Sequence, residues 1–530
     1  MRVLATDGLE KEGIDLLKQH GLEVDVRSGF HEEELARILG EFDAIIVRTA
    51  TKINKKTLEH KGILKIICCA TAGVDNIDVD AATEQGVVVM NVPGGNANAV
   101  AEHTLALMLN MVREIESSSS ALKKGRWIKS EIMGSELQGK TLGIMGLGNI
   151  GSIVAKKAKG LGMQVIVCDP YVEENPILER ERFVDMDTLL AQSDFISLHV
   201  SLTDETKGMI SKRELALMKD GACLINCARG QIVDEEALKK ELRTGRIKAA
   251  LDVYRGEPNP DPELVHLAQI ATPHTAGTTT ESRSFIAQQC ARQIIDALVH
   301  EKWENAVNLP PMDPGVMPYM HLAQLLGQFA ARLWFVGEPK RFSEIRFEYF
   351  GDIRDLDLRM VTRAGLTGLI STFSSSGAVS LVNAEISARN RGFIVSSGGS
   401  DKKREYTNLI AIEIAGKGGE IHRIEGIAMG ENKMQIVRID GYNPTVELSD
   451  IMLVFINEDR PGVIYDVTGV IKRQKININR FNLSDKGDDG TAMAVLSLEE
   501  PLSDAALKRI SQIKDKDGKT IRFLKQLSFE

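Results

Sequence analysis

Short apolar segments alternate with longer amphipathic segments along the first part of the chain. One strand is expected at each of Arg2–Ala5, Glu23–Val26, Ala44–Val47, Leu64–Cys68 and Val87–Asn91. The segments between them place apolar residues at helical spacing. Because strands that alternate with helices usually pair side by side in parallel, the pattern predicts a parallel α/β unit over residues 1–98.

The alternation resumes after two predicted helices, about Ala99–Arg113 and Glu114–Lys124. Further strands are expected at Thr141–Met145, Gln164–Cys168, Phe195–Leu198, Ala222–Asn226, Ala249–Val253 and Gln269–Ala271, and a helix over Thr280–His300. Residues 308–315 then hold three prolines and a glycine, which is typical of a linker. A second α/β unit is therefore predicted before the linker.

Residues beyond the linker indicate two smaller units that mix strands and helices. The first begins with a helix over Met320–Phe335 and a strand over Ser343–Gly351. The last unit is expected to have strands at Met452–Ile456, Ile476–Leu483, Ala492–Leu498 and Thr520–Leu524. One helix, Val463–Gln474, follows the first of these strands, and a second helix begins at about Ser503, before the last strand. That order is the one found in ferredoxin-like folds.

Composition changes this picture mainly by exclusion. The 530 residues are 43% hydrophobic and 26% charged, with a net charge of −9. A negative chain has no general attraction to nucleic acid or to an anionic membrane, so we expect neither as a partner. No apolar run reaches the ~18 residues that a membrane span needs. The segment Met1–Asp7 reads as a first strand and not as a signal peptide.

The six cysteines follow no spacing that is typical of zinc ligands or of a disulfide framework. Cys68 and Cys69 are adjacent, and Cys223 and Cys227 are four residues apart. We therefore expect reduced and mostly buried thiols, no bound metal, and a cytoplasmic location.

A glycine-rich turn carries the strongest chemical signal in the chain. Gly146-Leu147-Gly148-Asn149-Ile150-Gly151 follows the strand Thr141–Met145 and opens a helix, and Asp169 follows the next strand. In a dinucleotide-binding unit the first glycine makes the turn, the second admits the pyrophosphate and the third lets helix and strand approach. An acid at the position of Asp169 would bind the adenosine ribose and repel a 2′-phosphate. The segment therefore predicts NAD, and hence redox chemistry.

Polar residues at later strand ends suggest what is oxidised. Arg229, Glu257 and His274 follow three strands of the nucleotide unit, and ligands of open α/β sheets lie at the carboxyl ends of strands. An arginine fork can hold the carboxylate of a 2-hydroxy acid and polarise its carbonyl oxygen. A histidine can accept the hydroxyl proton near neutral pH, and a glutamate would orient it. Taken singly, each residue also has an ordinary structural explanation.

Several of these segments resemble a known enzyme family. Gly146–Gly151, Cys227–Gly230, Ala250–Val253 and Pro273-His274 are similar to the signatures of D-isomer-specific 2-hydroxyacid dehydrogenases. Arg229, Glu257 and His274 match the catalytic Arg, Glu and His of that family in order and spacing. The resemblance covers residues 1–308. Residues 320–440 and 450–530 resemble the allosteric substrate-binding domain and the ACT domain of the long-form D-3-phosphoglycerate dehydrogenase branch, with Val379–Ala384 and Asp459–Gly462 as the clearest parts.

This resemblance implies a four-domain architecture. A Rossmann-type, doubly wound NAD domain, residues 99–274, would be inserted in a smaller flavodoxin-like α/β substrate domain made of residues 1–98 and 275–308. Two α+β regulatory domains would follow, an intervening domain at 316–445 and a ferredoxin-like ACT domain at 450–530. It also implies a homotetramer whose dimer contacts run through the core.

The resemblance further implies the residues of each site. For NAD these are Gly146, Gly148, Asn149, Ile150, Gly151, Asp169, Cys227, Arg229, Asp252, His274 and Gly277. Substrate contacts are expected from Arg48 to the phosphate, from the amides of Ala72 and Gly73 and from Arg229 to the carboxylate, and from Asn96 and His274. Ala72–Asp78 and Asn91–Asn96 look like substrate-side segments, and Trp127 and Lys129 lie where a family member reaches into a neighbouring subunit.

Two positions depart from the family pattern. Cys69 stands where many members carry a second phosphate-binding arginine, which leaves the phosphate pocket short of a charge. Thr275-Ala276-Gly277-Thr278 follows His274 in place of the commoner Ile/Leu-Gly-Ala/Gly-Ser/Ala. Because the residues stay small, we expect little effect of the second departure on the chemistry.

The main hypothesis is NAD-dependent oxidation of 3-phospho-D-glycerate to 3-phosphohydroxypyruvate, the first committed step of L-serine synthesis. In the terminal unit, the resemblance implies that Asp459 and Asn477 hold an L-serine effector between subunits, although turn capping would also explain Asp459 and a role at the start of a strand would explain Asn477. One alternative is a broader dehydrogenase that reduces 2-oxoglutarate, glyoxylate or hydroxypyruvate. A second is a non-catalytic NAD-sensing binding protein.

Overall fold

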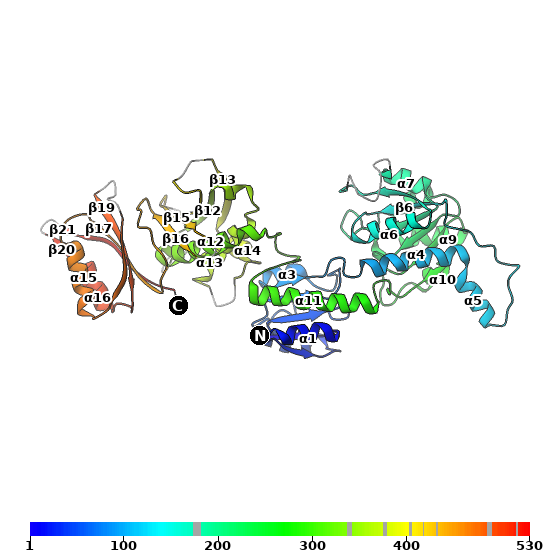
Figure 1. The fold of residues 1–530 in the computed structure, drawn as a ribbon, viewed down its shortest axis with the longest axis horizontal. Coiled ribbons are helices and arrows are strands. Elements are labelled where there is room, and N and C mark those ends of the chain that lie inside the picture. The colour runs from blue at the N-terminus through cyan, green and yellow to red at the C-terminus, as the bar shows by residue number, and fades with distance from the viewer. Residues whose placement is uncertain are drawn as a thin grey trace.

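The computed structural model describes residues 1–530 except 173–181, 336–341, 375–378, 402–404, 417, 431–432, 485–489, 516–517 and 530. The chain forms separate lobes, each built on its own main sheet (Figure 1). The N-terminal lobe, with α1 and α11, lies between the lobe around β6 and the two C-terminal lobes.

The N-terminal lobe is a parallel sheet flanked by helices. Its strands are β1 (Arg2–Ala5), β2 (Glu23–Val26), β3 (Ala44–Val47), β4 (Ile66–Cys69) and β5 (Val88–Met90), in the order β2-β1-β3-β4-β5. This is the flavodoxin-like order. The helices are α1 (Lys11–Gln19), α2 (Glu32–Ile38), α3 (Val79–Glu84) and α11 (Thr280–His300). Thus the predicted parallel α/β unit is confirmed.

Helix α11 belongs to this lobe although the whole second lobe separates it from α3 along the chain. It packs against α1 so closely that a methyl group added to Gly13 would lie 2.6 Å from the carbonyl oxygen of Ala287. Its residues Ile286, Cys290 and Ile294 are buried in one core with Val3 and Ile66.

The second lobe is a six-stranded parallel sheet in the order β11-β10-β9-β8-β6-β7. Its strands are β6 (Thr141–Met145), β7 (Gln164–Cys168), β8 (Phe195–Leu198), β9 (Cys223–Asn226), β10 (Lys248–Leu251) and β11 (Ile270–Ala271). Its helices are α4 (Ala97–Arg113), α5 (Ile115–Lys123), α6 (Asn149–Gly160), α7 (Met186–Gln192), α8 (Lys212–Leu217), α9 (Glu235–Thr244) and α10 (Pro262–Leu267). The strand order reverses between β6 and β8, which marks the ligand crevice of such sheets.

The third lobe packs α12 (Met317–Ala330) and α13 (Arg359–Ser371) against a mixed sheet. The sheet has the order β13-β12-β14-β15-β16. Its strands are β12 (Phe342–Gly351), β13 (Ile394–Ser400), β14 (Asn408–Gly416), β15 (Ile421–Ala428) and β16 (Met434–Ile439), and α14 (Ala384–Asn390) precedes β13. Ser380 Oγ donates to the carbonyl oxygen of Gly86 at 2.9 Å, which ties this lobe to the first.

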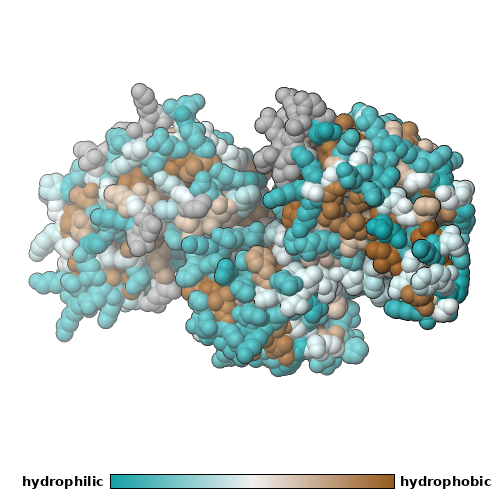
Figure 2. Space-filling view, turned by 45° about the vertical axis from the view of Figure 1, so that its right-hand side comes forward, coloured by the Kyte–Doolittle hydropathy of each residue, from teal (hydrophilic) through white to brown (hydrophobic). Residues whose placement is uncertain are grey.

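The terminal lobe has the predicted ferredoxin-like order. Strands β17 (Ile451–Glu458), β18 (Ile478–Leu483), β19 (Thr491–Leu498) and β22 (Ile521–Ser528) form the antiparallel sheet β18-β19-β17-β22. Helices α15 (Val463–Arg473) and α16 (Asp504–Ser511) pack on it, and β20 (Lys514–Asp515) pairs with β21 (Gly518–Lys519). Among the described residues no helix is both long and apolar enough to cross a membrane, and the face in Figure 2 carries only separate hydrophobic patches.

Candidate active site

The glycine-rich turn after β6 has the geometry that a dinucleotide requires. Gly146 has a φ of +89°, a conformation that favours glycine. A methyl group on Gly148 would meet no atom within 4 Å, so the space over the first turn of α6 is open. A methyl group on Gly151 would lie 2.1 Å from the carbonyl oxygen of Gly146. The open N-terminus of α6 therefore presents N–H groups and partial positive charge to a pyrophosphate.

Asp169 follows β7 and reaches back to the same turn. Its Oδ2 accepts the N–H of Leu147 at 2.7 Å, and its Oδ1 accepts the N–H of Tyr171 at 2.9 Å. These bonds fix the carboxylate beside the glycines, where the ribose of a dinucleotide is expected. Since a carboxylate oxygen accepts more than one bond, Asp169 keeps capacity for the ribose hydroxyls. The residues present therefore fit NAD.

His274 and Glu257 form an ion pair at the carboxyl edge of the same sheet. The Nδ1 of His274 lies 2.7 Å from Oε2 of Glu257. The bond to Glu257 raises the pKa of His274 above its ordinary value, while burial acts against it. Burial raises the pKa of Glu257, but hydrogen bonds from His274 and from the N–H of Tyr254 outweigh it and lower that pKa. The pair is poised to hold a proton on the imidazole.

A buried carboxylate binds residues on both sides of His274. Asp252 is fully buried and accepts bonds from the hydroxyl of Thr272 at 2.6 Å and from the N–H groups of Thr275 at 2.9 Å and Ala276 at 3.0 Å. His274 has a φ of +52°, which is unusual for a residue with a side chain. Asp252 thus stabilises an unfavourable backbone that directs the imidazole, and its carboxylate is surrounded by protein.

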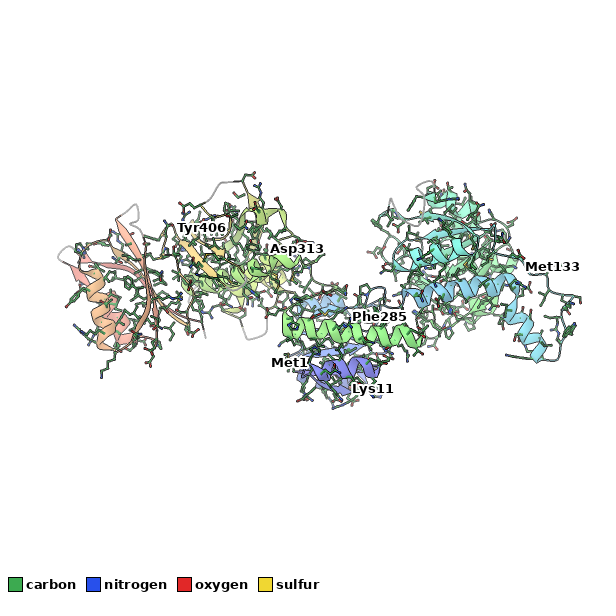
Figure 3. All side chains as sticks on the ribbon, in the orientation of Figure 1. Met1, Lys11, Met133, Phe285, Asp313 and Tyr406 are labelled. Atoms are coloured by element: carbon green, nitrogen blue, oxygen red, sulfur yellow. The ribbon has the colours of Figure 1, made fainter. Side chains whose placement is uncertain are left out.

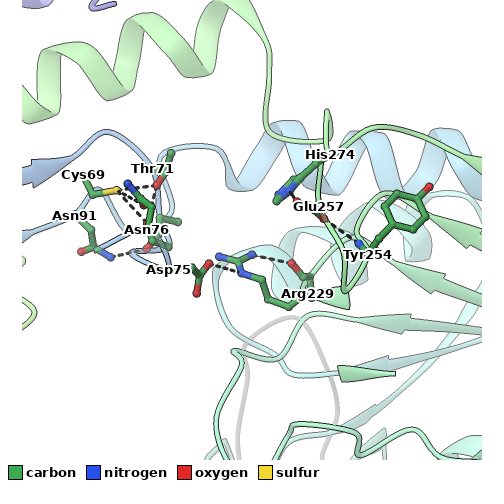
Figure 4. A network of polar contacts seen from close by, with 12 residues as sticks. Cys69, Thr71, Asp75, Asn76, Asn91, Arg229, Tyr254, Glu257 and His274 are labelled. Atoms are coloured by element: carbon green, nitrogen blue, oxygen red, sulfur yellow. Dashed lines mark hydrogen bonds and ion pairs between the residues drawn. The ribbon is translucent and has the colours of Figure 1, made fainter. Parts of the chain in front are cut away.

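Arg229 joins the first lobe to the second. Its Nε donates to Oδ2 of Asp75 in the first lobe at 2.8 Å, and its Nη1 donates to the carbonyl oxygen of Ala228 at 2.7 Å (Figure 4). A methyl group on Gly73 would lie only 2.1 Å from Nη2. The guanidinium therefore lies directly over the loop at Gly73, with Nη2 facing it.

Side-chain hydrogen bonds fix the loop of residues 71–76. Asn91 Nδ2 donates to the carbonyl oxygen of Ala72 at 2.5 Å, and Thr71 Oγ1 donates to that of Gly73 at 2.6 Å. Cys69 is fully buried beneath the loop, and its thiol contacts Thr71 and the carbonyl oxygen of Gly73 (Figure 4). Within the described residues the N–H groups of Ala72 and Gly73 have no acceptor. They remain available to an anion beside Arg229.

Other predicted residues meet where the chain crosses between the two lobes. A methyl group on Gly277 would lie 2.4 Å from Nδ2 of Asn96, and one on Gly94 would lie 3.1 Å from Nδ2 of Asn149. Asn96 precedes α4, whereas Gly277 lies just ahead of α11. The crossing segments therefore contact each other beside the glycine-rich turn.

The other predicted residues lie outside the contacts described above. Cys227 packs its thiol in the core, where burial raises its pKa to about 12. The guanidinium of Arg48 pairs with Glu10. Trp127, on the segment after α5, is 77% exposed. That segment extends away from the other lobes, and Met133 marks its outer part (Figure 3).

Asp459 and Asn477 are not brought together within one chain. The N–H of Asp459 donates to Gly490 just before β19, whereas the carbonyl oxygen of Asn477 accepts from Glu499 just after it. The eight residues of β19 separate them, roughly 25 Å at the rise of a strand.

Asp75 was missed as a site residue by sequence reasoning. It lies in the segment Ala72–Asp78, which resembles a substrate-side segment, but its partner Arg229 is 154 positions away. No local pattern pairs them. The signal available was an acid two residues after a glycine that the substrate was expected to contact.

Comparison with known proteins gives a consistent result. Residues 105–276 match the NAD binding domain of D-isomer specific 2-hydroxyacid dehydrogenases, residues 315–440 match the D-3-phosphoglycerate dehydrogenase intervening domain, and residues 451–515 match the ACT domain. D-3-phosphoglycerate dehydrogenase of Archaeoglobus fulgidus is 36% identical over 97% of this chain and 98% of its own. The Bacillus subtilis protein of that name is 34% identical over 97% and 98%.

Solved structures resemble a little over half of the chain. The TT0316 protein of Thermus thermophilus is 34% identical with a TM-score of 0.54, covering 58% of this chain and 100% of its own. The apo form of D-lactate dehydrogenase from Escherichia coli is 28% identical with a TM-score of 0.52, over 58% and 100%.

Proposed function

The chain belongs to the D-3-phosphoglycerate dehydrogenases within the D-isomer-specific 2-hydroxyacid dehydrogenase family, and from this we propose that it oxidises 3-phospho-D-glycerate to 3-phosphohydroxypyruvate, the first committed step of L-serine synthesis. It is an NAD-dependent oxidoreductase. The observation that carries the proposal is the meeting of Arg229 with the Gly73 loop, on the sheet edge that also holds the His274–Glu257 pair.

The proposed roles follow from these contacts. The substrate carboxylate would lie between the amides of Ala72 and Gly73 and the guanidinium of Arg229, which would also polarise the reacting oxygen. His274 would accept the hydroxyl proton, and Glu257 would stabilise the imidazolium that results. The bound nicotinamide supplies the hydride acceptor. Asn96 would contact the substrate from the crossing segment.

The phosphate would lie at Arg48. Asn76 Nδ2 donates to the carbonyl oxygens of Arg48 at 2.8 Å and of Thr51 at 2.6 Å, so the backbone at Arg48 is joined to the loop that contains Gly73. A three-carbon acid bound at Gly73 would then direct its far end towards Arg48.

The same edge would hold NAD. Gly146, Gly148 and Gly151 would admit the pyrophosphate over α6, with the backbone of Asn149 and Ile150 facing it. Asp169 would bind the ribose. Asp252 and Cys227 would act through the backbone they position, and Gly277 would leave room beside the nicotinamide.

The function is tested by measuring NADH formation by the wild type and by two variants. Wild-type protein should form NADH from 3-phosphoglycerate at alkaline pH, and His274→Ala should lose turnover while still binding NADH. His300→Ala, an exposed histidine at the end of α11, is the matched control. Fast reduction of 2-oxoglutarate, glyoxylate or hydroxypyruvate, with no NADH formed from 3-phosphoglycerate, would favour the broader dehydrogenase instead.

We also propose the domain division 1–98 with 275–308, 99–274, 316–445 and 450–530. The core shared by α11 with β1 and β4 supports the return of the chain to the first domain. The packing of α4 against α6 supports its place in the NAD domain.

The ACT domain suggests an amino-acid effector, and we propose L-serine, bound between subunits. Strand β18 is an edge strand with partly exposed Phe481 and Leu483. Two copies paired antiparallel along β18 would bring the Asn477 end of one domain to the Asp459 end of the other. That arrangement would provide both residues for one ligand.

We propose a cytoplasmic homotetramer. The exposed apolar side chains of Leu122, Trp127 and Met133 on and after α5 are suited to a contact between subunits, and Lys129 lies on the same segment. All six cysteines are free thiols, as a reducing compartment would keep them.

A further inference from the structure

Three charged side chains from distant parts of the chain meet at the carboxyl edge of the first sheet. Glu10 precedes α1, Arg48 follows β3, and Arg283 lies in the first turn of α11. Glu10 Oε2 pairs with Nη2 of Arg48, and its Oε1 lies 3.9 Å from Nη1 of Arg283. One carboxylate thus joins two guanidiniums.

This cluster adjoins the proposed phosphate position. Asp7 accepts the N–H of Arg48 at 2.7 Å and the hydroxyl of Thr51 at 2.7 Å, and Asn76 ties the same turn to the Gly73 loop. Arg48 is mostly buried, with its side chain 14% exposed, whereas that of Arg283 is 53% exposed. The open side of the cluster is therefore the side of Arg283.

The charge balance at this edge depends on Arg283. Asp7 and Glu10 together outweigh Arg48, so without Arg283 the group would carry one net negative charge. A phosphate monoester carries about −1.5 to −2 charges at neutral pH and would be repelled. Cys69 supplies no compensation, because it is fully buried beneath the loop and burial raises its pKa to about 11.

Arg48 itself is left with an unsatisfied donor. Its Nε is shielded from solvent and has no acceptor among the described residues. A phosphate that replaced Glu10 could bind Nε and Nη2 together, since the guanidinium fork matches such oxygens. Glu10 would then need another cation, and Arg283 is the one beside it.

We propose that Arg283 is the second cation of the phosphate-binding end and sets the preference for a phosphorylated substrate. This inference rests on the proposed function. When phosphate binds to Arg48, Arg283 becomes the ion-pair partner of Glu10. Its positive charge removes the repulsion that the carboxylates would exert on the phosphate.

The test compares two substrates that differ only in the phosphate. Reduction of 3-phosphohydroxypyruvate and of hydroxypyruvate by NADH is measured for wild type, Arg283→Gln, Arg283→Lys and Glu10→Gln. Arg292→Gln is the matched control, an exposed arginine on the same helix, about 13 Å further along it.

Arg283→Gln should raise KM for 3-phosphohydroxypyruvate about ten-fold, the scale of one hydrogen bond to a charged group. Its KM for hydroxypyruvate and both kcat values should stay at wild-type levels. Arg283→Lys should restore most of the affinity, and Glu10→Gln should lower KM for the phosphorylated substrate. Equal changes for both substrates, or no difference from Arg292→Gln, would overturn the proposal.

A binding measurement separates this proposal from the proposed function. Calorimetry with 3-phosphoglycerate added to the NADH-loaded enzyme should show weaker binding to Arg283→Gln than to Arg292→Gln. That result would support the role of Arg283 even if wild type failed to oxidise 3-phosphoglycerate. Unchanged binding would reject it even in an active enzyme.

Discussion

Replacing Gly73 with alanine tests the contact between the Gly73 loop of the first lobe and Arg229 of the second. The added methyl group would lie 2.1 Å from Nη2 of Arg229 and 3.2 Å from Oδ2 of Asp75. Non-bonded heavy atoms are comfortable near ~3.5 Å, so the guanidinium must retreat by roughly 1.4 Å. The retreat would break the 2.8 Å bond between Arg229 and Asp75.

The expected loss is catalytic and not structural. The atom that gives way is the end of a flexible side chain, so the fold should survive. A misplacement of about 1 Å in a positioning group costs on the order of 10²-fold in rate. We therefore expect kcat/KM for 3-phosphoglycerate to fall about 100-fold, while the melting temperature and the NADH dissociation constant stay unchanged.

The assay follows NADH absorbance over a range of 3-phosphoglycerate concentrations, with NADH fluorescence and thermal melting alongside. Gly469→Ala in α15 is the matched control, because a methyl group there meets no atom within 4 Å. If Gly73→Ala were as active as this control, the placement of Arg229 over the loop would be refuted.

Three further predictions concern the proton, the cofactor and the effector. Glu257→Gln removes the negative charge of the hydrogen-bond partner that raises the pKa of His274, so that pKa falls and the rising limb of kcat/KM against pH for oxidation moves to lower pH; an unmoved limb would contradict the assigned base. Asp169→Ala removes the charge that repels a 2′-phosphate, so kcat/KM with NADP should rise relative to NAD in parallel assays. L-Serine should slow the wild type and release heat on binding, and Asn477→Ala should lose both; a wild type indifferent to serine would remove the effector.

The sequence predicted the strands best where burial requires apolar side chains. The strands at Arg2–Ala5, Ala44–Val47 and Phe195–Leu198 have the predicted bounds, since each is a largely apolar run that is buried in a parallel sheet. Strand β13 was missed within a stretch rich in Ser and Gly. It is a largely exposed edge strand next to β12, so no apolar face marks it.

Some residues of the candidate site could likewise be predicted from the sequence, and others could not. The glycine turn and Asp169 could be predicted because one strand-helix-strand unit contains them. The pairs Arg229–Asp75 and Glu10–Arg283 could not, because their members come from different elements and meet only in the folded chain. The buried role of Asp252 was equally hidden, since a motif shows that an acid is present but not that three donors surround it.

The chain crosses twice between the first and second lobes, and these crossings explain why such distant pairs meet. The chain leaves the first lobe near Asn96 and returns near Gly277, and these residues contact each other. Each of the two sheets pairs only strands of its own lobe. Rotation about it would change the distance from Arg229 to Gly73 without disturbing either sheet. The groups that would hold the substrate anion therefore depend on the angle between the lobes, whereas the glycine turn, Glu257 and His274 follow strands of one sheet and do not.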